Sequence, residues 1–173
     1  LTLGSSGSMA NSGTIKVANG ATFNVSAVTG GWTLGGNQTL GGSGTILGNV
    51  TFSGNSSFNV SDIIASGTPL SMASGSIITF GSGFGIANLT GVVNWDALNL
   101  STPYTLISTN QTFTSGDIAN FGLANAAPVG TGRFAYFQNG SLQLVVVPEP
   151  STIVLVGLSC AAVGLIARRR RLK

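Results

Sequence analysis

Short runs of alternating polar and apolar residues follow one another along residues 1–102. Alternation with a period of two places the apolar side chains of an extended strand on one face. Segments rich in Gly, Ser and Asn separate the runs, and these residues are typical of tight turns. Before the C-terminal tail we find no stretch with convincing helical periodicity. The pattern therefore predicts a mainly β fold, with strands at Thr14–Val17, Thr22–Val25, Trp32–Leu34, Asn49–Phe52, Ser57–Val60 and Ile77–Phe80.

Weak internal repeats suggest how these strands are arranged. Gly13-Thr14-Ile15 returns as Gly44-Thr45-Ile46, and Phe23-Asn24-Val25-Ser26 returns as Phe58-Asn59-Val60-Ser61. Repeats of this kind are typical of a β-solenoid, in which each coil adds a strand to a growing parallel sheet. An antiparallel sandwich is the alternative, because short strands and Gly-rich turns suit it as well. We favour a β-solenoid over residues 1–102.

Residues 103–147 show a different pattern. Arg133–Phe137 and Ser141–Val147 flank an Asn139-Gly140 pair, which is a strong hairpin signal. Pro103–Ser108 is a further candidate strand. The last coil of a solenoid would otherwise expose its core and its strand edges. We therefore expect antiparallel cap strands here that close the C-terminal end of the stack.

An uncharged apolar run, Ile153–Ala167, lies in the final segment of the chain, residues 148–173. As a helix it would be roughly 22 Å long, which is short of the ~30 Å hydrocarbon core of a bilayer. Thr152 can extend the run, and the stems of the arginines that follow can snorkel. The pattern predicts one marginal transmembrane helix over residues 152–167.

A basic tail, residues 168–173, closes the chain. Positive charge stays on the cytoplasmic side of a membrane. The arginines therefore predict a stop signal, with the C-terminus in the cytoplasm and residues 1–147 outside it. The chain opens with Leu1 and shows no signal peptide, so we expect an export signal upstream of the given sequence. The residues of the stop signal are Arg168, Arg169, Arg170 and Arg171.

Charge is distributed very unevenly. The net charge is +3, but residues 148–173 carry +4 and residues 1–147 carry −1. The basic character therefore belongs to the tail. Binding to nucleic acid needs Lys and Arg spread over a surface, so we expect no nucleic-acid partner.

The sequence offers little for catalysis. It has no His and one Cys, Cys160, which removes Ser-His-Asp or Cys-His chemistry and zinc sites built from Cys and His. Asp62, Asp96 and Asp117 are the only acids of residues 1–147. Glycosidase chemistry would need two of them to face one bond. We expect no enzyme, no metal site and no cofactor, with a polysaccharide-active β-helix enzyme as the remote alternative.

A short motif with two prolines connects the body to the apolar run. Each proline fixes φ and removes an amide donor, so we expect the segment to be extended, unpaired and exposed. An extended peptide beside a membrane is what the cleft of a processing enzyme can accept. The residues of the motif are Pro148, Glu149, Pro150, Ser151 and Thr152.

The order of this motif, the apolar run and the arginine cluster at the C-terminus resembles the PEP-CTERM sorting signal of Gram-negative-type bacteria. The resemblance implies that an exosortase, an integral-membrane cysteine transpeptidase-like enzyme, recognises Pro148, Glu149 and Pro150 and removes the tail. It also implies a transient stay in the inner membrane, delivery to the cell surface or extracellular matrix, and a link to exopolysaccharide and biofilm. Residues 1–90 resemble the passenger strand repeats of bacterial autotransporter-like surface proteins.

Two features leave a binding function open. Trp32 and Trp95 could stack on sugar rings if exposed, although burial in the core is the favoured interpretation. Asn-x-Ser/Thr recurs along the chain, which indicates either glycan acceptors or plain strand alternation. Our first hypothesis is an exported structural or adhesive protein of the surface or matrix. A carbohydrate-binding surface module is the second.

Overall fold

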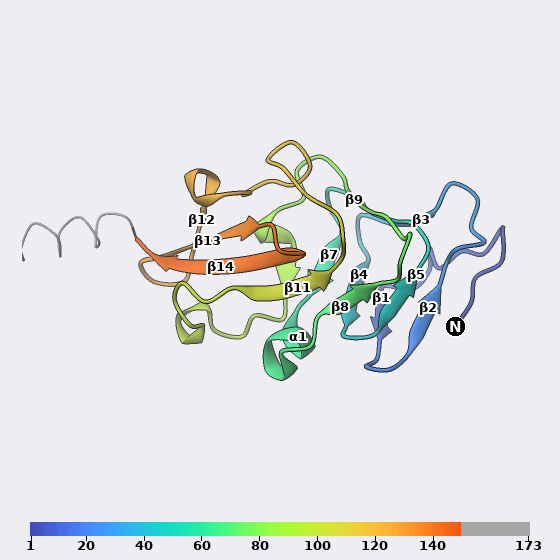
Figure 1. The fold of residues 1–173 in the computed structure, drawn as a ribbon, viewed down its shortest axis with the longest axis horizontal. Helices are drawn as coiled ribbons and strands as arrows, with labels where there is room; N and C mark the ends of the chain where they lie inside the picture. The colour runs from blue at the N-terminus through green and yellow to red at the C-terminus, as the bar shows by residue number, and fades with distance from the viewer. Residues whose placement is uncertain (150–173) are drawn as a thin grey trace, which may run out of the picture.

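Parallel strands of three β-sheets form the sides of a β-helix-like body in a computed structural model, which describes residues 1–149 (Figure 1). The first sheet has the order β1-β4-β7-β10, the second contains β2-β5-β8-β11, and the third is β3-β6-β9. Strands of one sheet come from successive coils and pair in parallel, which confirms the predicted mainly β, β-helix-like body. Their bounds are β1 (Thr14–Val17), β2 (Thr22–Asn24), β3 (Trp32–Leu34), β4 (Thr39–Gly42), β5 (Thr45–Leu47), β6 (Val50–Phe52), β7 (Ser57–Asn59), β8 (Leu70–Met72), β9 (Ile78–Phe80), β10 (Leu89–Thr90) and β11 (Tyr104–Ser108).

Alternating side chains of these strands build the core. Ile15 and Val17 of β1 are buried, whereas Thr14 and Lys16, which alternate with them, are exposed. The parallel register then stacks apolar residues of successive coils on one another, as for Phe52 of β6 and its partner in β9. The core therefore runs along the solenoid as a continuous column.

The sequence repeats do not mark equivalent positions in successive coils. Thr14 of β1 pairs with Thr39, whereas its repeat partner Thr45 pairs with Thr22 in a different sheet. Phe23 and Phe58 likewise belong to different sheets. The repeats correctly suggested stacked coils, but the repeated segments do not occupy the same position in successive coils.

The second repeat instead encodes a local turn. The side-chain Oδ1 of Asn24 accepts hydrogen bonds from the backbone N and the Oγ of Ser26, at 3.0 and 2.7 Å. Asn59 makes the same two bonds with Ser61, at 3.0 and 2.7 Å. Asn and Ser close such turns readily. At these two sites, Asn-Val-Ser therefore ends a strand, which strand alternation alone does not explain.

The expectation of no helix before the C-terminal tail was wrong. Helix α1 (Ser61–Ser66) lies between β7 and β8, but its six residues are too few to show helical periodicity in the sequence. Gly41 and Gly42 belong to β4 and are buried. A side chain at residue 42 would meet the carbonyl oxygen of Val17, so glycine there permits close approach of two strands.

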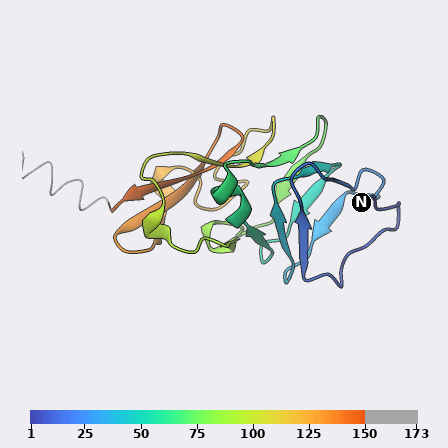
Figure 2. The same ribbon diagram turned by 90° about the horizontal axis from the view of Figure 1, so that it is seen from below.

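An antiparallel hairpin extends the second sheet at the end of the body opposite the N-terminus (Figure 2). It comprises β13 (Arg133–Gln138) and β14 (Leu142–Pro148), with β12 (Ala127–Val129) on its outer edge. β14 pairs antiparallel with β11, which itself pairs in parallel with β8. Antiparallel strands were predicted over residues 103–147, and β12, β13 and β14 confirm them, with the hairpin turning at Asn139-Gly140 as the sequence indicated. The candidate strand at Pro103–Ser108 is β11, which instead continues the parallel sheet of the solenoid next to β8.

Side-chain amides connect neighbouring coils. Asn88, in the 3₁₀ turn η1 (Ile86–Asn88), donates through Nδ2 to the carbonyl oxygens of Gly54 and Ser56, at 2.9 and 2.7 Å. Its Oδ1 accepts from the amide of Gly85 at 2.8 Å. The amide therefore satisfies three backbone groups that the strand ladders leave open. Other side-chain amides of the described residues that bond backbone groups of a distant segment are those of Gln38, Asn49, Gln111, Asn120 and Asn139.

Replacing Asn88 with alanine should lower the free energy of unfolding by about 2–3 kcal/mol, because three hydrogen bonds of about 1 kcal/mol each are lost. The exposed Asn37 is the matched control, and its alanine variant should stay within about 0.5 kcal/mol of the parent. Urea unfolding of the two variants measures the difference. Equal midpoints would show that the Asn88 bonds contribute nothing net.

Candidate functional site

The candidate site is the junction between the folded body and the C-terminal tail, at Pro148 and Glu149. Pro148 is the last residue of β14 and lies opposite Arg133 of β13. The amide of Glu149 donates to the carbonyl oxygen of Gly132 at 2.9 Å. We expected the motif to be extended and unpaired. The expectation that it is unpaired is wrong for its first two residues, Pro148 and Glu149. Proline ends the ladder only at its own nitrogen, so the next amide can still pair.

The turn that holds Glu149 is itself fixed by a small polar network. Arg133 donates through Nη1 to the carbonyl oxygen of Leu98 at 2.7 Å and to that of Trp95 at 3.3 Å. Its Nε lies 3.4 Å from Oδ1 of Asp96, which also accepts from the amide of Thr131 at 2.9 Å. Two chain segments, the 3₁₀ turn η2 (Trp95–Ala97) and the β12–β13 turn, are thereby joined.

This network fixes the position of the turn but contributes little to the free energy of folding. The side chains of Arg133 and Asp96 are 19% and 41% exposed, and ion pairs that reach solvent contribute at most about 1 kcal/mol. Gly130 and Gly132 have φ values of +54° and +62°, a conformation that suits glycine. The tight turn they permit presents the amide of Thr131 inward and the carbonyl of Gly132 toward the tail. The origin of the tail is therefore set by the fold.

The rest of the predicted sorting segment lies outside the described residues. This applies to Pro150, Ser151 and Thr152, to the helix predicted over 152–167, and to the stop signal. Cys160 lies there as well. Among residues 1–149, no helix has the length and apolar character needed to span a membrane.

The acids of the body serve separate structural contacts. Asp62 lies 2.7 Å from the Nζ of Lys16. Asp117 accepts from the amide and the hydroxyl of Thr114, at 2.8 and 2.7 Å. Asp96 belongs to the network around Arg133. Within residues 1–149, no cluster of three His, Cys, Asp or Glu side chains could hold a metal ion.

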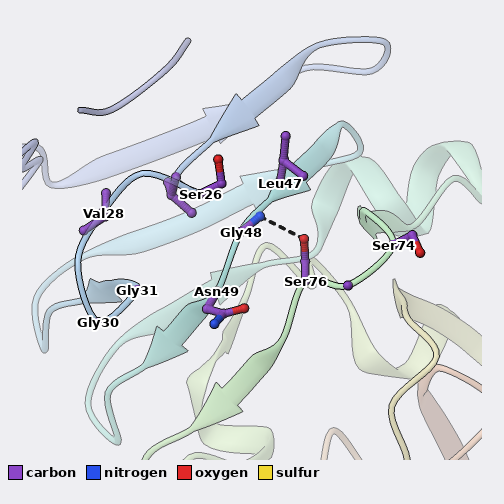
Figure 3. Close-up of a pocket in the computed structure, with 11 residues that line it drawn as sticks. Ser26, Val28, Gly30, Gly31, Leu47, Gly48, Asn49, Ser74 and Ser76 are labelled. Atoms are coloured by element: carbon purple, nitrogen blue, oxygen red, sulfur yellow. Dashed lines mark hydrogen bonds between the residues drawn. The ribbon is translucent and has the colours of Figure 1, made fainter. Parts of the chain in front are cut away.

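An open groove crosses the turns of three coils between the second and third sheets (Figure 3). Its lining consists of Gly, Ser, Asn and small apolar residues, and one hydrogen bond within it joins the amide of Gly48 to Oγ of Ser76 at 2.8 Å. The lining includes neither an aromatic nor a charged side chain. A groove of this composition has few groups that could orient a ligand.

The tryptophans differ in their surroundings. Trp32 is 4% exposed and packs edge-on against Phe23, with ring centroids 5.0 Å apart. Burial in the core is thus confirmed for Trp32, and a role in stacking on sugar rings is wrong. Trp95 is half-buried and packs against the core from η2.

Fold and site together define a β-helix-like body whose last strand runs directly into a C-terminal sorting segment. Residues 146–171 match the PEP-CTERM protein-sorting motif. The match begins at Val146, so its first residues belong to β14. The chain therefore carries a PEP-CTERM signal, which implies exosortase-dependent sorting to the cell envelope or surface.

No curated protein and no solved structure matches the chain. The resemblance of residues 1–90 to autotransporter passenger repeats therefore stays a prediction.

Proposed function

We propose that this protein is a structural or adhesive component of the bacterial surface or extracellular matrix, processed at its tail by an exosortase. The tail passes through the inner membrane, the enzyme cleaves near Pro148–Pro150, and the released body becomes part of the envelope or of an exopolysaccharide matrix. The sorting motif at residues 146–171 is the observation that carries this proposal.

The body supports a non-catalytic role. Asp62, Asp96 and Asp117 each have their own structural partners, so none is held as one of a facing pair. Carbohydrate binding through Trp32 is not available, because its ring is in the core. What the body presents instead is three sheets with outward Thr, Ser and Asn side chains and little charge.

Deleting the exosortase gene of the host tests the processing step. In the parent strain the mature protein should end close to Pro148–Pro150, whereas in the deletion strain residues 151–173 should remain attached. Intact-mass measurement of the protein recovered from each strain identifies the C-terminal residue. A tail removed at the same bond in both strains would overturn the assignment. Restoring the gene is the control, and it should restore the shorter mass.

A further inference from the structure

The link between the folded body and the apolar run of the tail is very short. Glu149 is still hydrogen-bonded to Gly132, so only residues 150–152 separate it from Ile153. Four residue steps span at most about 14 Å when fully extended. If the run from Ile153 enters a bilayer, as the proposed function requires, the end of β14 must lie within that distance of the lipid surface.

The loop beside this end of β14, residues 91–103, exposes apolar side chains. Val93 is 98% exposed and Leu100 is 42% exposed. Val93 also lines an open groove whose lining is largely apolar and includes Ile64, Val92 and Leu98. An exposed apolar side chain that adjoins an apolar groove extends it into a contiguous apolar surface, and contiguous apolar surfaces indicate interaction sites.

Contacts fix this loop next to the origin of the tail. The amide of Ser101 donates to the carbonyl oxygen of Val146 at 2.7 Å, and Arg133, opposite Pro148, donates to the carbonyl oxygen of Leu98. Figures 1 and 2 agree, since in both views the yellow-green loop lies beside the orange-red end of β14. The exposed apolar residues and the start of the tail therefore share one end of the body.

Charge on the loop is compatible with a lipid interface. Asp96 is the only charged residue in the loop, and Arg133 pairs with it. Trp95 and Tyr104, both half-buried, lie in or directly after the loop. Trp and Tyr are the side chains enriched where membranes meet water.

We propose that the loop of residues 91–103 rests on the lipid surface of the bilayer while the tail is inserted, with Val93 and Leu100 in the interface. The inference rests on the proposed function. A lipid surface is favoured over a protein partner because the three-residue link brings the loop to the bilayer without any further component. The face is then free again once the tail is removed.

Site-directed fluorescence quenching tests the proposal on the full chain. Cys160 is first replaced by serine, and single cysteines are introduced as Val93→Cys, Thr33→Cys and Val156→Cys. Thr33 is an exposed residue of β3 at the N-terminal end of the body and serves as the matched control. Each variant carries an environment-sensitive dye and is reconstituted into vesicles of phosphatidylethanolamine and phosphatidylglycerol that contain a headgroup-level quencher.

Dye at residue 93 should be quenched about twofold or more relative to dye at residue 33, because interfacial side chains sit roughly 5–10 Å into the headgroup boundary. Protection of residue 156 from an aqueous quencher reports tail insertion separately. An inserted tail with equal quenching at residues 93 and 33 would overturn this inference and leave the proposed function intact. A tail that does not insert would overturn both. Far-UV circular dichroism checks that each variant is folded.

Discussion

Replacing Phe52 with alanine should lower the free energy of unfolding by about 3–5 kcal/mol, the usual cost of removing a buried phenylalanine ring. Phe52 is 0% exposed and lies at the centre of an aromatic cluster. Its ring centroid is 5.7 Å from that of Phe58, 5.5 Å from that of Phe80 and 5.3 Å from that of Phe84. These rings come from two successive coils and the turn that follows β9, so the cavity would open between stacked coils.

The side chains around residue 52 cannot easily move into the cavity that loss of the Phe52 ring leaves. The neighbours of Phe52 in its own sheet, Leu34 and Phe80, are held by parallel ladders on both sides of β6. Shifting either would strain two strands at once, so we expect the cost near the upper end of the range. Since domains are typically stable by only about 5–15 kcal/mol, the variant should be marginally folded.

Urea unfolding followed by circular dichroism measures this change, with Leu123→Ala as the control. Leu123 is 59% exposed, and its loss should change the free energy by no more than about 0.5 kcal/mol. A Phe52→Ala variant that unfolds at the same urea concentration as the control would contradict the central role of the cluster.

The strands named from the sequence were found because the turns beside them carry clear signals, whereas β4, β5, β8, β10 and β12 were not among the strands predicted. Thr14–Val17 and Trp32–Leu34 were predicted with the bounds that the structure shows, and the hairpin strands were correct to within one residue. Asn-Gly turns and period-two burial are local properties, and local properties can be read from a sequence.

The stacking of coils was less predictable. The spacing between paired strands changes from coil to coil, as in Thr14 with Thr39 and Thr39 with Ser57. Turns of different length and the inserted α1 cause this, so the repeats have no constant period. Nor did the polar composition identify the role of Asn88, because hydrogen bonds to a distant coil depend on the register itself.

At the site, the sequence located the sorting motif but not its attachment. Two prolines suggested a free peptide, whereas Glu149 is held by the carbonyl of Gly132. That contact depends on Arg133 and Asp96 fixing a turn from outside the motif. If the proposed exosortase binds the motif as an extended chain, the hydrogen bond between Glu149 and Gly132 must open before the first residues of the motif can enter its cleft.

Replacing Glu149 with alanine should block removal of the tail while leaving the fold unchanged. Glu149 has the only acidic side chain of residues 118–173, so its carboxylate is the one group of the motif that an enzyme can recognise by charge. Losing one partner of a desolvated charge pair costs about 2–5 kcal/mol, which corresponds to a fall of roughly 30-fold or more in processing. Glu149 itself is exposed, and the hydrogen bond to Gly132 uses its backbone amide, which alanine keeps.

Stability should therefore stay within about 0.5 kcal/mol of the parent, which separates a recognition defect from misfolding. The measurement is the fraction of protein that retains residues 151–173, determined by intact mass in a host with its exosortase. Thr131→Ala is the matched control, because Thr131 is exposed in the adjacent turn and contributes only its backbone amide to the network. Processing of Glu149→Ala at the rate of that control would show that the carboxylate is not read by the enzyme. Glu149→Asp, which keeps the charge on a shorter side chain, should recover part of the processing if charge is what the enzyme reads.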